Sequence, residues 1–167
     1  MQGTYTTWMV YLSVALAMVV SHAFLSLASR ATGAQGRARA IWLIGGMIAT
    51  GIGLWSIHLI VLLSLQLPIA LTYDIATGVV ALWIAVVTCG ATLALVSGIR
   101  VTPFKLFLGA MVASVGVCGL AHTGISSIRV APEVVYEDAL IATSVGVAFA
   151  SALAAFLIAF TLPLERG

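Results

Sequence analysis

Apolar runs long enough to cross a bilayer recur along nearly the whole chain, and they constrain its fold more than any other feature. About 20 helical residues span the ~30 Å hydrocarbon core, where only helices and closed barrels satisfy their backbone polar groups. We expect spans at roughly residues 8–29, 41–65, 75–98, 103–125 and 139–162. The sequence therefore predicts an all-α integral membrane domain of five transmembrane helices, with residues 1–167 forming a single unit.

Composition supports this class and excludes others. Hydrophobic residues make up 62% of the chain, charged residues make up 7%, and the mean hydropathy is +1.21. A soluble domain carries about 25% charged residues. The net charge of +2 is small and scattered, so no nucleic-acid partner is expected. No nucleophile and base are paired in the pattern, so we do not expect an enzyme.

The basic residues lie in alternate connections. Arg30, Arg37 and Arg39 follow the first apolar run, and Arg100 and Lys105 lie between the third and fourth runs. Because Lys and Arg gather in cytoplasmic connections, we predict that the N-terminus is outside and the C-terminus inside. The chain would then be a multi-pass protein of a bacterial inner membrane, with the first run retained rather than cleaved.

An internal repeat with an offset of 63 residues relates the second span to the fourth. The coinciding pairs are Gly46 with Gly109, Gly53 with Gly116, Ser64 with Ser127 and Tyr73 with Tyr136. Two helices make one repeat, so both copies cross the membrane in the same direction, unlike the inverted repeats of many transporters. We therefore expect the corresponding outer ends to lie at equal depth around one axis.

A histidine lies inside the second span. His58 shares a helix face with Trp55, and an ionisable group at such depth marks a candidate functional site. A helix-packing histidine hydrogen-bonded across the bundle is the alternative. Tyr73 and Asp74 follow this span, and Tyr136 recurs in the second copy. Interfacial anchoring and helix capping explain them most simply, but their recurrence also favours a role beside a ligand.

The fourth span carries a second candidate group. Cys118 and His122 are four residues apart and share a face with Met111, and a thiol with an imidazole suits a soft metal such as copper. Ordinary packing is the alternative. His22 in the first span differs from His58 in depth by roughly 12 Å at 1.5 Å per residue, so one small metal site would not hold both. A haem held by two helices is a less favoured possibility.

These residues resemble the MHYT domain, a bacterial integral-membrane sensory module named for a repeated Met-His-Tyr-Thr motif. Residues 55–62 are similar to its Trp-Ser-Met-His-Phe-Ile-Gly-Met segment, and residues 116–125 to Gly-Ile-Ala-Ala-Met-His-Tyr-Thr-Gly-Met. The resemblance implies a sensor of a small ligand at the outer half of the bilayer, with copper or a diatomic gas proposed. It also implies a cytoplasmic signalling partner, either a cyclic-di-GMP enzyme or a histidine kinase, and a further helix pair beyond this chain.

The chain departs from the family pattern at the ligands proposed for copper. Methionines of the motif are replaced by Ile57, Leu62, Leu120 and Ile125, and the second motif histidine is replaced by Ala121. His58 is then the expected central ligand, with Cys118 and His122 as substitute metal ligands. Its surrounding partners are expected to be Trp55, Tyr73, Asp74 and Tyr136.

Two functions follow from this pattern. The first is a membrane sensory input domain that binds a small ligand or metal near the outer leaflet and signals to a cytoplasmic partner. The alternative is a degenerate MHYT-like structural or assembly subunit of a membrane complex, and a homo-oligomer is compatible with either function.

Overall fold

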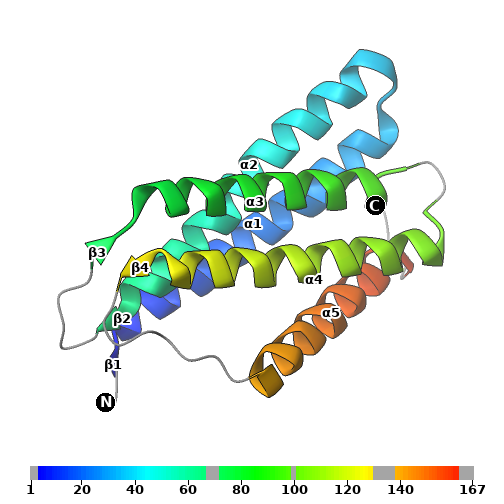
Figure 1. Cartoon of the computed structure of the whole chain (residues 1–167). Coiled ribbons are helices and arrows are strands. Elements are labelled where there is room, and N and C mark those ends of the chain that lie inside the picture. The colour runs from blue at the N-terminus through cyan, green and yellow to red at the C-terminus, as the bar shows by residue number, and fades with distance from the viewer. Residues whose placement is uncertain (1–3, 67–71, 99–100, 130–137, 162–167) are drawn as a thin grey trace.

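The computed structural model describes residues 4–66, 72–98, 101–129 and 138–161, and long helices dominate it (Figure 1). Five helices are long and apolar enough to cross a membrane, which confirms the predicted spans and a multi-pass membrane protein. Their bounds are α1 Thr7–Gly33, α2 Gly36–Ser64, α3 Ile75–Val96, α4 Pro103–Ser126 and α5 Asp138–Thr161.

The first connection is shorter than the sequence pattern predicted. The apolar runs end near residue 29 and resume near 41, but only Ala34 and Gln35 separate α1 from α2. Hydropathy marks the part of a helix that fits the hydrocarbon core, whereas the helix itself continues through polar residues beyond that core. Gly36 has φ 55°, a left-handed conformation that glycine adopts without steric cost, and it allows the chain to reverse there.

Short β-strands, which the all-α prediction did not include, close the first two helix pairs. β1 (Thr4–Tyr5) pairs antiparallel with β2 (Leu65–Gln66), and β3 (Thr72–Tyr73) pairs antiparallel with β4 (Ile128–Arg129). Each ladder joins the chain that enters one helix to the chain that leaves the next. The protein therefore contains two units of the same plan, β1-α1-α2-β2 and β3-α3-α4-β4.

Equivalent hydrogen bonds complete the two ladders. The Thr6 amide donates to the Ser64 carbonyl at 2.8 Å, and the Asp74 amide donates to the Ser127 carbonyl at 2.9 Å. These carbonyls end α2 and α4, where backbone groups lack partners within the helix. Figure 1 shows all four strands at one end of the molecule, so the two units point in the same direction.

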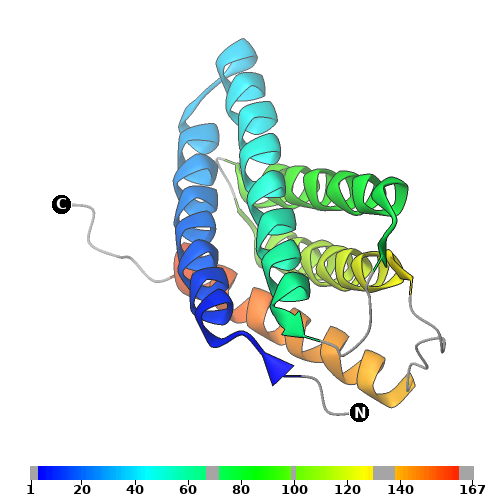
Figure 2. The same ribbon diagram turned by 90° about the vertical axis from the view of Figure 1, so that its left-hand side faces the viewer.

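Glycine allows close helix contact at the same place in each unit. A Cβ on Gly53 of α2 would lie 2.6 Å from Cγ2 of Val20 in α1, and a Cβ on Gly116 of α4 would overlap the side chain of Thr88 in α3. Small residues at such contacts let helices approach in lipid, where van der Waals packing drives association. Figure 2 shows the resulting pairs, with α1–α2 crossing α3–α4 obliquely.

The two units and α5 enclose two buried clusters at different depths. One lies towards the strand end and contains Ala81, Ala85 and Leu120. The other lies towards the opposite end and contains Ala28, Leu93, Val96, Leu106, Ala110 and Phe156. α5 reaches the second cluster through Phe156, whose ring stacks on Phe24 of α1 with centroids 6.3 Å apart.

Basic side chains bind the helix ends opposite the strands. The Arg39 guanidinium, at the start of α2, donates to the Ser97 carbonyl at the end of α3 at 2.8 Å. Arg30 lies over the Trp42 ring, 5.1 Å from its centroid, as a cation–π contact requires. Lys105 lies in the first turn of α4 at the same end. The basic residues from which we predicted the cytoplasmic side thus lie together, among the described residues, at the end opposite the strands.

Candidate functional site

His58 lies in the second half of α2, and its imidazole occupies the space over Gly124 of α4. A Cβ on Gly124 would overlap the His58 Nε2 atom and would lie 2.6 Å from Cδ2. Gly124 is buried. Only glycine accommodates the ring here, because any larger residue would place atoms where the imidazole lies. His58 therefore marks the contact between the second helices of the two units.

The Nε2 atom of His58 is buried and has no hydrogen-bond partner among the described residues. Leaving a buried polar group unpaired costs about 1–3 kcal/mol, so such atoms are uncommon in folded proteins. The predicted alternative, a histidine bonded across the bundle, is not what the described residues show. The imidazole packs against α4 at Gly124, and its Nε2 is a buried polar atom without a partner among the described residues.

Trp55 fixes α2 against α3 one turn before His58. Its Nε1 donates to the Gly78 carbonyl at 3.2 Å, and its ring packs on the cluster of Ala81, Ala85 and Leu120. The two aromatic side chains of this turn thus contact different helices: Trp55 contacts α3, and His58 contacts α4. Trp55 holds α2 against α3, so a displacement of the His58 side chain would mainly affect the contact between α2 and α4.

Asp74 is the N-cap of α3. Its Oδ2 accepts hydrogen bonds from the Thr77 amide at 3.2 Å and from the Thr77 hydroxyl at 2.5 Å, and its charge meets the positive end of the helix dipole. The capping role predicted for this residue is therefore confirmed. Tyr73 lies in β3, with its backbone paired to Ile128, and Tyr136 lies outside the described residues.

Cys118 and His122 lie on a different face of α4 from the His58 contact. Gly116, Leu120 and Gly124 recur every four residues on the buried face. His122 is exposed, because two residues beyond Leu120 turn it about 200° around the helix at 3.6 residues per turn. The structure therefore does not bring His58 together with Cys118 and His122.

The described part of the chain contains no cluster of side chains that would form a metal site. No three His, Cys, Asp or Glu side chains gather there as a metal ion would need. His22 is exposed on α1. Met111 is 43% exposed on the same outer side of α4 as His122. Of the predicted ligands, only His58 places a nitrogen at a contact between helices.

Sequence reasoning missed Gly124 as the partner of His58. The repeat predicts that the outer ends of the second and fourth spans lie at equal depth, and Gly124 does lie at the depth of His58. The repeat does not tell which face of α4 turns inward. The available signal was the spacing of small residues, since Gly116 and Gly124 are two turns apart and small residues mark helix contacts in membranes.

A family model supports the same segment. The model described as "MHYT: Bacterial signalling protein N terminal repeat" matches residues 51–110. Residues 51–110 of this chain are thus similar to an MHYT repeat. The matched segment starts in the second half of α2, contains His58 and the Asp74 cap, and ends in α4. The match confirms the resemblance inferred from the motifs, and the His58 contact joins the matched segment to the following part of α4.

Two bacterial relatives match almost the whole chain. The bifunctional diguanylate cyclase/cyclic di-GMP phosphodiesterase MucR of Pseudomonas aeruginosa is 34% identical over 160 residues, covering 96% of this chain and 23% of the relative. The signaling protein YkoW of Bacillus subtilis is 28% identical over 163 residues, covering 98% of this chain and 20% of the relative. The chain thus spans less than a quarter of either relative. No solved structure matches it.

Copper is the metal that the MHYT resemblance implies. Whether this chain suits copper depends on which donor side chains lie together. Imidazole is a suitable ligand for copper, and His58 offers one whose buried Nε2 has no partner in the described segments. The thiol and imidazole expected to accompany it point away on α4. The described residues therefore supply one donor and no closed copper site, and further donors would have to come from outside them.

Proposed function

We propose that this chain is the membrane sensory input domain of a bacterial signalling system, located in the inner membrane. Its five spans place it in a bilayer, and the matched family is described as a signalling-protein repeat. One relative is named as a signaling protein, and the other is named as a cyclic di-GMP enzyme. The chain itself would supply the input rather than a catalytic step.

The ligand site in this proposal is the His58 contact between α2 and α4. The observation that carries it is the buried Nε2 of His58, unpaired in the described part of the chain and pressed against Gly124. The bound group would be small, because the imidazole already fills the space over the glycine. A metal such as copper, or a small molecule that hydrogen-bonds to Nε2, fits this chemistry, and the MHYT resemblance favours copper.

The signal in this proposal leaves through the basic ends of the helices. α2 carries His58 near its strand end and Arg39 near its start, and Arg39 bonds the end of α3. A small displacement of α2 against α4 at His58 would therefore reach the Arg39–Ser97 contact along one continuous helix. We place this end in the cytoplasm, where a cyclic-di-GMP enzyme or a histidine kinase would receive the change.

Metal binding by purified protein tests the site. The detergent-solubilised chain is titrated with Cu(I) against a chromogenic chelator, and copper, zinc and iron are measured in the protein as purified. His58→Gln keeps a polar side chain but removes the imidazole. We expect wild type to bind one Cu(I) and His58→Gln to bind at least about tenfold more weakly, because a ligand has been lost.

Two exposed histidines provide matched controls. His22→Gln and His122→Gln remove an imidazole from exposed positions on α1 and α4, and both should bind Cu(I) as wild type does. Equal, negligible metal in wild type and His58→Gln would overturn the metal form of the proposal. Loss of binding in His122→Gln alone would move the site to the outer face of α4.

A structural or assembly subunit is the second candidate, and one observation favours it. Met111, Val115 and His122 form an exposed stripe on α4. A partner helix would bury this stripe. Purification in mild detergent separates the two functions: a stoichiometric partner with a metal-free chain supports the subunit, and a metal-loaded chain without a partner supports the sensor.

A further inference from the structure

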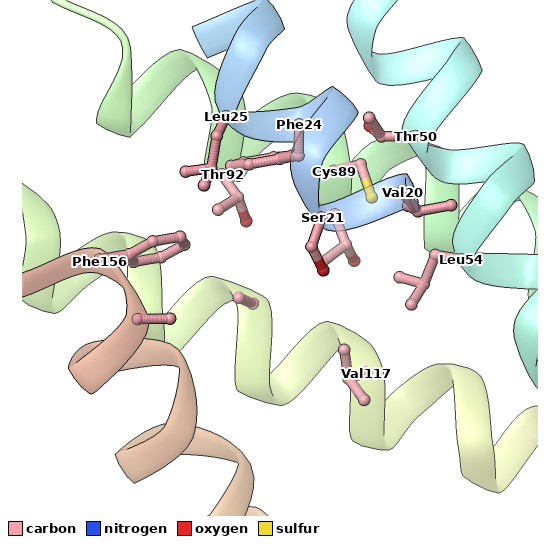
Figure 3. Close-up of a pocket in the computed structure, with 13 residues that line it drawn as sticks. Val20, Ser21, Phe24, Leu25, Thr50, Leu54, Cys89, Thr92, Val117 and Phe156 are labelled. Atoms are coloured by element: carbon pink, nitrogen blue, oxygen red, sulfur yellow. The ribbon is translucent and has the colours of Figure 1, made fainter. Parts of the chain in front are cut away.

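A cavity of about 280 Å³ lies in the middle of the molecule, where all five helices contribute to its wall (Figure 3). Along α3 it is lined by Thr88, Cys89 and Thr92, which lie between the two buried clusters. His58, Trp55 and Gly124 do not line it. The cavity is therefore a second place, separate from the His58 contact, where a bound molecule would touch both units and α5.

Thr92 provides an unpaired hydroxyl at the wall of this cavity. The residue is 3% exposed, and its Oγ1 has no hydrogen-bond partner among the described residues. A helical threonine usually bonds the carbonyl four residues earlier, as Thr50 bonds Gly46 at 2.7 Å. Thr92 does not, and Figure 3 shows its hydroxyl directed into the open space.

The rest of the wall is mostly apolar and aromatic. Phe24 and Phe156 line one side as a stacked pair, and Leu54 and Val117 line the other (Figure 3). Cys89 and Thr50 also line the cavity, from α3 and α2. The Ser21 and Thr88 hydroxyls also line the cavity, and Thr92 supplies the buried hydroxyl that lacks a partner among the described residues. A mostly apolar wall with a few polar groups is the usual pattern of a small-molecule site.

The volume limits the size of an occupant. An apolar cavity of about 150 Å³ holds a benzene molecule, so about 280 Å³ admits one or two rings. We propose that the cavity binds a small apolar molecule with a single oxygen that hydrogen-bonds to Thr92, of the class of one- and two-ring phenols and quinones. Such a molecule reaches the site from the bilayer. Because it touches all five helices, its occupancy would hold α5 against the two units, independently of His58.

An alkylation-protection experiment tests this site with two matched probes. The purified full chain is treated with N-ethylmaleimide in the presence of 1-naphthol or naphthalene, and the labelling rate of each cysteine is measured by mass spectrometry. Cys89 lines the cavity, whereas Cys118 lies on another face of α4 and does not line it. Cys118 therefore reports any general effect of the probes on the micelle.

We expect 1-naphthol to protect Cys89 and leave Cys118 unchanged, at about fivefold lower concentration than naphthalene, as one net hydrogen bond predicts. Thr92→Val keeps the shape but removes the hydroxyl, so the two probes should then protect Cys89 equally. Thr92→Ser restores a hydroxyl and should restore the preference, which excludes a folding defect as the cause.

Three results would overturn the proposal. The first is no protection of Cys89 beyond that of Cys118 by either probe. The second is equal protection by the two probes in wild type, which would indicate an acyl chain or another purely apolar occupant. The third is an unchanged preference for 1-naphthol in Thr92→Val, which would place the hydrogen bond elsewhere.

Discussion

The contact between His58 and Gly124 makes a sharp prediction about Gly124→Ala. The added Cβ would overlap Nε2 and lie 2.6 Å from Cδ2 and 3.1 Å from Cε1 of the imidazole, so the ring or the helix must move. Overpacking of this kind costs about 1–3 kcal/mol. Replacing glycine by alanine inside a helix returns about 0.5–1 kcal/mol. We therefore expect a net loss of about 0–2.5 kcal/mol in the free energy of unfolding, from these two terms together.

The same substitution should behave differently where the imidazole is absent. In a His58→Ala background the added methyl has space, so Gly124→Ala should stabilise the protein by about 0.5–1 kcal/mol. The difference between the two backgrounds, a coupling of about 1–3 kcal/mol, measures the contact itself. Gly45→Ala is the control, because a Cβ there meets nothing within 4 Å, and it should stabilise both backgrounds equally.

Unfolding in mixed micelles with increasing dodecyl sulfate, followed by far-ultraviolet circular dichroism, supplies the four free energies. A coupling below about 0.5 kcal/mol would mean that the two sites behave independently. The imidazole would then not lie over Gly124, and the proposed site between the two units would lose its geometric basis.

Two further substitutions test other contacts. Asp74→Ala should lower the free energy of unfolding by about 0.5–2 kcal/mol, because α3 loses its N-cap. Asp74→Asn should retain most of the stability, because an amide oxygen still accepts from Thr77. The same micelle titration measures both variants. Arg39→Ala should lower the free energy of unfolding by about 1.5–3 kcal/mol, the range for a hydrogen bond from a charged group. It should also increase amide hydrogen exchange at the end of α3. Unchanged exchange near Ser97 would show that Arg39 does not join the two helix ends.

The membrane-spanning helices could be predicted from the sequence because the bilayer fixes the length of an apolar run. Pro103 and Asp74 also marked the starts of α4 and α3, since each residue type suits a helix N-terminus for a local reason. The β-ladders could not be predicted in this way. Two residues, such as Thr4–Tyr5, are too few to show an alternating pattern, and their pairing with Leu65–Gln66 depends on how α1 and α2 reverse.

The site was predictable only in part. Depth within an apolar run singled out His58, and the structure places it at a helix contact, where its buried Nε2 has no partner among the described residues. Its expected companions were not placed beside it, because α4 is apolar on both sides and hydropathy cannot choose which side faces inward. The face with Cys118 and His122 has the side chains that could bind a metal, whereas the face with Gly116 and Gly124 allows closer helix packing. The glycine face is the one that is buried.

The central claim is that His58, alone among the three histidines of the chain, is the position where a bound group enters the contact between α2 and α4. Nuclear magnetic resonance of protein labelled with ¹⁵N in its histidine rings tests this most directly, with each signal assigned from a His→Gln variant. On addition of Cu(I), the account predicts a change in the Nε2 signal of His58, with the signals of His22 and His122 unchanged. A change confined to His22 or His122, or no change at any of the three, would contradict it.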